Sequence, residues 1–297
     1  MASRGGFGEG DETMFTVVDR ISWPGSPERA NEDSCGVSGD WAWVIDTSIF
    51  PGTPPIMNEV SDAAWLARFA SERLSELAAR AHDGDGVALL RHVMEEARVT
   101  FLARAPEERH DVLTWPVGAM TLVHRTGPVL DVWTFADTTA FVRRPDGSVL
   151  TVGEAPELRG YEAAKAAELL RASGSTPKTI FEAPLFQAWL TERRQRQKEG
   201  RGLALLGLDP AAADRVRHRQ VPCEDGTVVL LTSDGFSALV DLYGETDATG
   251  LVEAALRDGL EPLARRAREI ETKEDPSGTR FPRFKESDDA TALLVRA

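Results

Sequence analysis

The segment Val228–Phe236 (VVLLTSDGF) constrains the fold of this chain more than any other. It opens with four branched apolar residues in a row, which suit a strand covered on both faces better than a half-exposed one. Asp234 follows where the strand leaves the core, and Gly235 allows the backbone to turn tightly. A carboxylate at this position is either a turn former or a ligand, and the segment by itself favours the turn former.

Acidic residues also stand at the ends of other apolar runs. The run 41–45 (WAWVI) ends on Asp46, and the closing run 291–295 (TALLV) is preceded by Asp288 and Asp289. Glu32 and Asp33 precede a short predicted strand at 35–37. The spacing of these residues leaves open whether the strand ends meet in space.

Convergence of these ends would create a specific kind of site. Carboxylates that crowd together raise each other's pKa and destabilise the fold, and a bound divalent cation removes that penalty. Ligation by oxygen alone selects Mg²⁺ or Mn²⁺ over metals that prefer thiolates. Two such ions bridged by one carboxylate can hold a hydroxide and clamp a phosphoryl group for in-line attack.

The rest of the pattern places helices between groups of strands. Apolar or alternating runs predict strands at 14–21, 35–37, 41–45, 118–124, 129–135, 139–142, 148–152, 215–221, 227–233 and 291–295. Helical spacing predicts one helix from the N-cap Ser61 to about residue 81, and others at 89–102, 161–173, 181–199 and 251–271. We interpret the basic run 193–198 as a solvated helix face. This order is typical of a layered α+β fold in which helices pack outside a sandwich of sheets.

Composition limits the classes of binding partner and the cellular compartment that we expect. The net charge of −14 disfavours nucleic acid and anionic membranes, because both bind basic surfaces. The two cysteines, Cys35 and Cys223, form neither a metal motif nor a disulfide framework, so we expect a reducing cytoplasm. We find no signal core and no run long enough to span a membrane. The Gly-rich, acidic N-terminus predicts a disordered tail at 1–11. No linker divides the rest of the chain, so we expect one domain over 12–297. We also expect the protein to be a monomer.

Six short motifs, in order and over nearly the whole chain, resemble those of the metal-dependent protein phosphatases of the PP2C (PPM) family. They are 31–34 (NEDS), 43–46 (WVID), 135–142 (FADTTAFV), 204–207 (ALLG), 230–236 (LLTSDGF) and 287–291 (SDDAT). Each motif is weak alone, whereas six in the right order indicate the fold. The resemblance implies a four-layer α/β-β/α sandwich, with two antiparallel sheets flanked by paired helices.

The resemblance also implies a reaction and a set of catalytic residues. Asp46 would bridge two Mn²⁺ or Mg²⁺ ions, and Asp234 and Asp288 would bind one of them. In this family a water held between the metals attacks the phosphorus of a phosphoserine or phosphothreonine, without a phosphoenzyme intermediate. The expected partner is therefore a phosphorylated protein.

Other residues follow from the same motifs with smaller roles. Glu32 would help to hold the second ion, directly or through water, with Asp33 beside it. The carbonyl of Thr47 would replace that of the family's glycine as a ligand. Asp289 stands where the family has asparagine, and both Asp33 and Asp289 are candidate metal ligands, with a turn or strand-cap role as the alternative for each. Asp137 matches the residue that binds a third, weaker metal in bacterial relatives, although a structural role is the more frequent use of such an aspartate.

Departures from the family pattern support an alternative function. Thr47 follows Asp46 where the family has glycine, and the position of the phosphate-binding arginine holds Glu28, with Arg29 one residue later. We predict that Arg29 binds the substrate phosphate. The alternative is a regulatory or phosphoprotein-binding protein of the same fold with weak or no catalysis. We expect the five histidines to be non-catalytic and the tryptophans to pack in the core.

Overall fold

The protein, described by a computed structural model over residues 14–57, 60–80, 84–153 and 155–297, contains two antiparallel sheets. The predicted tail at 1–11 lies outside the described residues. The first sheet has the order β1 (Thr16–Trp23), β11 (Ala290–Arg296), β10 (Val228–Thr232), β6 (Thr139–Arg143) and β7 (Val149–Val152). The second has the order β2 (Asp33–Ser38), β3 (Trp41–Ser48), β4 (Val117–Thr126), β5 (Val129–Phe135) and β9 (Arg217–Pro222), with β8 (Leu206–Gly207) paired to β4.

The two sheets pack against each other through one face of each strand. In β10, Val229 and Leu231 join a cluster between the sheets, whereas Val228 and Leu230 join a cluster on the helix-covered side. All five residues of β10 are buried, as the unbroken apolar run predicts. The central strand of the first sheet is therefore covered on both faces.

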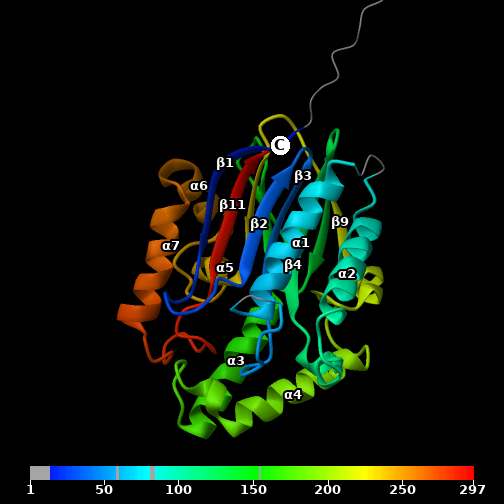
Figure 1. Ribbon diagram of the computed structural model, residues 1–297. Coiled ribbons are helices and arrows are strands. Elements are labelled where there is room, and N and C mark those ends of the chain that lie inside the picture. The colour runs from blue at the N-terminus through cyan, green and yellow to red at the C-terminus, as the bar shows by residue number, and fades with distance from the viewer. Residues whose placement is uncertain (1–13, 58–59, 81–83, 154) are drawn as a thin grey trace, which may run out of the picture.

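Helices cover the outer face of each sheet (Figure 1). The second sheet is covered by α1 (Asp62–Ala78) and α2 (Gly86–Leu102). The first sheet is covered by α5 (Asp234–Asp241), α6 (Ala248–Asp258) and α7 (Leu260–Glu269). Helix α7 continues into a π-helical turn (Ile270–Glu274). Ser61 caps α1, as predicted, by accepting a hydrogen bond from the amide of Ala63 at 3.1 Å. The predicted α+β class, two antiparallel sheets flanked by helices, is confirmed.

The sequence-based boundaries were wrong at two places on the first sheet's outer layer. Gly259, at φ 82°, divides the predicted helix 251–271 into α6 and α7, because that conformation interrupts a right-handed helix. Helix α5 was not predicted: it begins at Asp234, so the segment first interpreted as a turn is a strand followed directly by a helix.

Two further helices, α3 (Ala155–Ser173) and α4 (Pro184–Lys198), lie beyond one end of the sandwich (Figure 1). They pack through a small apolar cluster that contains Leu169 and Phe186. The ring of Phe284, from the loop before β11, packs at a tilt against Phe186 and Trp189, with ring centres 5.2 Å and 5.0 Å apart. The remaining helical turns are short: Glu107–Arg109, Val112–Thr114, Ile180–Glu182 and Pro210–Arg215. In the described part of the chain no helix has both the length and the apolar character needed to cross a membrane.

Candidate active site

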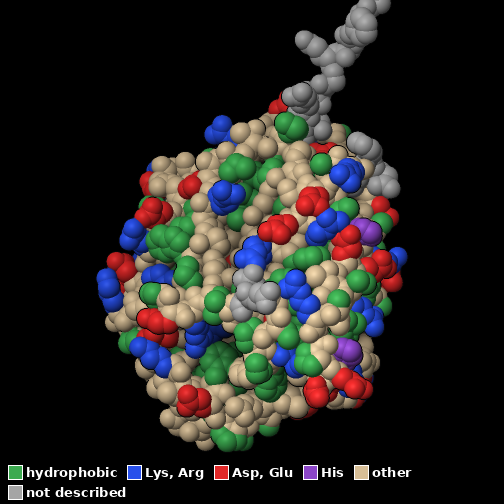
Figure 2. Space-filling view, viewed as in Figure 1, with side chains coloured by type: hydrophobic (Ala, Val, Ile, Leu, Met, Phe, Trp, Pro, Cys, Tyr) green, Lys and Arg blue, Asp and Glu red, His purple; other side chains and the backbone are tan. Residues whose placement is uncertain are grey.

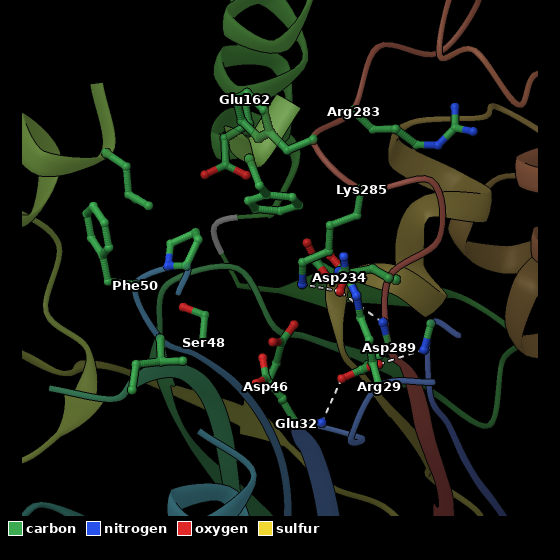
Figure 3. Close-up of a pocket in the computed structure, with 18 of the residues that line it drawn as sticks. Arg29, Glu32, Asp46, Ser48, Phe50, Glu162, Asp234, Arg283, Lys285 and Asp289 are labelled. Carbon is green, nitrogen blue, oxygen red and sulfur yellow. Dashed lines mark hydrogen bonds and ion pairs between the residues drawn. The ribbon is translucent and has the colours of Figure 1, made fainter. Parts of the chain in front are cut away.

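Three strand ends meet at the end of the sandwich that faces α3 and α4 (Figure 3). Asp46 comes from β3, Asp234 from the start of α5 after β10, and Asp288 from the loop before β11. All three line one cavity of about 790 Å³. The tertiary structure therefore brings together residues that lie up to 242 positions apart in the sequence.

A glycine permits the close approach of two of these carboxylates. A Cβ atom on Gly235 would lie 2.1 Å from the backbone oxygen of Asp289, a distance that real Cβ atoms do not show. Ser233 fixes the same junction, because its amide donates to the carbonyl of Thr291 and its hydroxyl accepts from the amide of Thr291, each at 2.9 Å. The Ser-Asp-Gly segment thus holds α5 directly against the start of β11.

The carboxylates interact strongly through space. Burial raises the pKa of Asp46 well above its ordinary value, and the negative charges of Asp33, Asp234 and Asp288 raise it further. Asp33 lies opposite Asp46 in the pairing of β2 with β3 and is only 8% exposed. Burial also raises the pKa of Asp33, and the charge of Asp289 adds to the rise. The cluster carries more negative charge than the fold alone stabilises.

A lysine that the sequence analysis missed provides part of the missing positive charge. The Nζ atom of Lys285 donates to Oδ1 of Asp288, three residues later in the same loop. Burial acts to lower the pKa of this ammonium, but attraction to Asp288, Asp46 and Asp234 outweighs it and raises the pKa well above the ordinary value. Figure 3 shows the Lys285 side chain pointing into the acidic cluster. The spacing Lys-x-x-Asp was visible in the sequence, but nothing local required the side chain to turn inward.

Glu32 and Asp289 hold the segment before β2 beside this cluster. Oε1 of Glu32 accepts from the hydroxyl of Ser61, the cap of α1. Oδ1 of Asp289 accepts from the amide of Gly25 at 2.7 Å, and Oδ2 accepts from the amide of Glu32 at 2.6 Å (Figure 3). Both oxygens of Asp289 are thus engaged with the backbone, which favours a positioning use of this carboxylate over direct ligation.

Thr47 has a structural use that glycine could not have. Its side chain is 1% exposed, and its hydroxyl lies 2.6 Å from the carbonyl of Glu32 and 2.8 Å from that of Ala63, so that it can donate to either. The amide of Thr47 also donates to the carbonyl of Glu32, at 3.1 Å. The amide of Glu32 donates to the carboxylate of Asp289. Strand β3 also continues through Thr47 to Ser48, two residues past the end expected at Asp46.

Asp137 lines the same cavity from the turn between β5 and β6. The residue before it, Ala136, has φ 53°, the left-handed region that favours glycine. In the glycine-aspartate-serine motif that 135–142 resembles, this position is glycine, so Ala136 adopts a backbone conformation that is strained for alanine. Asp137 also acts on α4, because its charge helps to raise the pKa of Arg193 against the effect of burial.

Arg29 lies at the exposed rim of the cavity. Its guanidinium stands 5.8 Å from the ring centre of Phe181, close to α4. The predicted phosphate-binding residue therefore lines the same cavity as the acidic cluster. Its guanidinium faces an aromatic ring, and it forms no ion pair with a carboxylate of the described residues. No described histidine lines the cavity.

The donor atoms of the cluster suit a hard divalent cation. They are carboxylate and backbone oxygens, which Mg²⁺ and Mn²⁺ prefer, and the single ammonium of Lys285 faces Asp46, Asp234 and Asp288. A divalent ion would relieve the repulsion that raises the pKa of Asp46. The arrangement is not closed, however: among the described residues no three Asp, Glu, His or Cys side chains are already grouped to hold an ion. The donor atoms fit the ion in their chemistry, and an ion bound by Asp288 would compete with the ammonium of Lys285 for that carboxylate.

Comparison with known proteins identifies the architecture. No protein-family model and no curated protein matches the sequence. Among solved structures, the Mycobacterium tuberculosis serine/threonine phosphatase PstP/Ppp is similar with a TM-score of 0.57 at 16% identity, covering 95% of this chain and 98% of that one. The catalytic domain of PstP in complex with two manganese ions gives a TM-score of 0.53 at 17% identity, with coverage of 95% and 98%.

A third similar structure is PppA, described as a key regulatory component of the T6SS in Pseudomonas aeruginosa. Its TM-score is 0.53 at 14% identity, covering 96% of this chain and 98% of that one. Structural similarity at such low sequence identity establishes the architecture, whereas the activity has to be argued from the site. The similarity covers 95% of this chain and 98% of each PstP structure, so the chain has the fold of the PP2C (PPM) serine/threonine protein phosphatases.

Proposed function

We propose that this protein is a metal-dependent phosphatase acting on phosphoserine and phosphothreonine in proteins. The observation that carries the proposal is the convergence of Asp46, Asp234 and Asp288 in one cavity, from three separate strand ends of a PP2C fold. Unrelieved repulsion among these carboxylates is a reason to expect bound cations. Mn²⁺ or Mg²⁺ is the ion type that matches the oxygen donors.

Roles for the chain's own residues follow from their places. Asp46 would lie between two ions, with Asp234 and Asp288 on one of them. Two bound ions would supply an activated hydroxide for direct attack on phosphorus. Arg29, at the cavity rim, would bind the phosphate oxygens of the substrate.

The second ion and a weaker third would be held by the surrounding segment. Glu32, Asp33 and the carbonyl of Thr47 would contribute ligands at the second position. Asp137 would serve the third, from the turn between β5 and β6. Asp289 would orient the segment before β2 through its two backbone hydrogen bonds rather than bind an ion.

The test is hydrolysis of phosphoserine and phosphothreonine peptides with and without Mn²⁺. We expect activity that requires Mn²⁺, is removed by EDTA, and is lost in Asp46→Ala and Asp234→Ala. Glu95→Ala, an exposed carboxylate on α2 that does not line the cavity, is the matched control and should keep full activity. An inactive wild-type protein at saturating Mn²⁺ would refute the proposal. Activity confined to a small phosphorylated metabolite would change the substrate class.

A second candidate is a PP2C-fold regulatory protein with weak or no catalysis. Lys285 favours it, because an ammonium among the metal ligands opposes ion binding. Metal stoichiometry separates the two candidates: two Mn²⁺ per chain by calorimetry support the enzyme, and none supports the regulator. A single domain, a monomer, a cytoplasmic location and the absence of nucleic-acid or membrane partners remain predictions for either candidate.

A further inference from the structure

Helix α4 carries two neighbouring arginines that have opposite environments. Arg193 donates from Nη1 to Oε1 of Glu162 at 2.5 Å and lies 5.6 Å from the ring centre of Trp189. Arg194 is 5% exposed, although its sequence neighbours suggested a solvated basic face. The interpretation of 193–198 as solvated was therefore wrong for Arg194, because the helix turns this residue inward.

Arg194 has no compensating anion in the described part of the chain. Its Nη1 is buried without a hydrogen-bond partner, and no described carboxylate forms an ion pair with it. Burial lowers the pKa of this guanidinium to about 10, and repulsion by Arg193 adds to the effect. A buried cation without a partner is strongly unfavourable, so a fold retains one mainly where a ligand completes it.

The cavity that Arg194 lines is the one that contains Asp46, Asp234 and Asp288. Arg194 belongs to its α4 wall, whereas Asp234 and Asp288 come from the sandwich side. A substrate segment that reaches the acidic cluster would thus pass beside α4. We propose that Arg194 forms a second anion-binding site, which takes a phosphate or carboxylate group of a peptide substrate.

This site differs from the phosphate position predicted for Arg29 in its place and in its burial. Arg29 is exposed at the rim, whereas Arg194 is enclosed and accepts only a group that enters the cavity. The inference rests on the proposed function for the identity of the peptide. It does not depend on metal binding or on catalysis, because Nη1 of Arg194 has no partner among the described residues whether or not hydrolysis occurs.

The experiment is calorimetric titration of the full chain carrying Asp46→Asn and Asp234→Asn, in the presence of EDTA. EDTA removes bound metal, and the two substitutions remove part of the negative charge that competes with an anionic ligand. Three probes are compared: inorganic phosphate, a phosphoserine peptide, and an unphosphorylated peptide rich in glutamate. Arg194→Met is the main variant. Arg196→Met is the matched control, because Arg196 is exposed on the same helix and does not line the cavity. Arg194→Lys keeps the charge and is the second variant.

We expect Arg194→Met to weaken binding of at least one probe by about tenfold or more, since hydrogen bonds to charged groups are the stronger ones. Arg196→Met should stay within about twofold of its parent, and Arg194→Lys should recover part of the loss. Arg194→Met should also raise the melting temperature without ligand, because it removes an unpaired buried charge. Binding of phosphate alone identifies phosphate as the ligand group, and binding of the acidic peptide identifies carboxylate.

Two results would overturn the inference. One is equal affinity of Arg194→Met and its parent for all three probes, including no binding by either. The other is a lower melting temperature in Arg194→Met together with unchanged binding by Arg194→Lys, which would assign the arginine to an internal contact. Because the background is inactive by design, neither result depends on whether the wild-type protein is a phosphatase.

Discussion

Replacing Lys285 with methionine should have opposite effects on the stability of the EDTA-treated protein and on its affinity for Mn²⁺. The ammonium contacts Asp288 and is attracted to Asp46 and Asp234, so its loss leaves these carboxylates with less compensation. An incoming ion has to displace the same ammonium from Asp288. The variant removes both the internal counter-ion and the competitor of the metal.

The size of both effects of Lys285→Met follows from the partial burial of the Lys285–Asp288 ion pair. The side chains of Lys285 and Asp288 are 29% and 26% exposed, so solvent screens the pair only in part. Hydrogen bonds to charged groups contribute about 1.5–3 kcal/mol, and we take about 2 kcal/mol for the loss. A change of this size corresponds to about 30-fold in a binding constant. It also corresponds to a fall in melting temperature of roughly 3 °C for a chain of this length.

Thermal unfolding in EDTA and calorimetric titration with Mn²⁺ measure the two effects. We expect Lys285→Met to melt earlier without metal and to bind Mn²⁺ about 30-fold more tightly. Lys178→Met is the matched control, because Lys178 pairs with Glu286 of the same loop but is 64% exposed and does not line the cavity. Unchanged Mn²⁺ affinity in Lys285→Met would show that the ammonium does not stand in the path of the ion. Weaker affinity would show that it supports the ion instead.

Four further outcomes test the account of the site. Thr47→Gly, which restores the family residue, should lower the free energy of unfolding by about 1–2 kcal/mol in urea titrations, because the carbonyls of Glu32 and Ala63 lose the hydroxyl that donates to them. Thr47→Ser keeps a hydroxyl and should keep most of that stability, and equal loss in both variants would contradict the reasoning. Gly235→Ala should lower the free energy of unfolding by about 1–3 kcal/mol and weaken Mn²⁺ binding, because its Cβ would lie 2.1 Å from a backbone oxygen. Gly160→Ala is the control and should not destabilise the protein, because nothing lies within 4 Å of the added Cβ. Ala136→Gly should raise the melting temperature through relief of up to about 1 kcal/mol of strain at φ 53°, and an unchanged or lower value would count against strain. EDTA-treated protein should become more stable as the pH is lowered toward the raised pKa of Asp46. Folding raises this pKa, so the folded protein binds a proton that the unfolded chain releases, and the corresponding stability is lost as the pH rises through the pKa of the folded state. Saturating Mn²⁺ should remove this pH dependence, and a metal-independent pH profile would contradict the proposed ligation.

Much of the fold could be predicted because its signals are local. The unbroken apolar run of β10 required cover on both faces, and the structure provides it from a second sheet and from helices. Ser61 was recognisable as a cap from its place before an amphipathic segment. The continuation of β10 into α5 was missed, because a short helix after a Ser-Asp-Gly turn has too few residues to show periodicity.

The order of the motifs identified the carboxylates, but it could not show how each one is used. Asp289 was counted among the metal ligands, and only the folded chain shows both its oxygens engaged with the amides of Gly25 and Glu32. Thr47 read as a departure from the family, and the structure shows its hydroxyl between the segment before β2 and the first turn of α1. These partners lie 15 to 264 residues away in the sequence, so no local pattern encodes them.

The sequence by itself determined most of the strands and helices, the fold class and the candidate acidic residues, because alternation, capping and motif order can be recognised without contacts between distant residues. The tertiary structure alone decided which charges meet. It placed the ammonium of Lys285 among the carboxylates of three strand ends and enclosed Arg194 in the opposite wall without a described partner. The energy of a charge depends on its burial and on neighbours brought from distant segments, and both are fixed only when the chain folds.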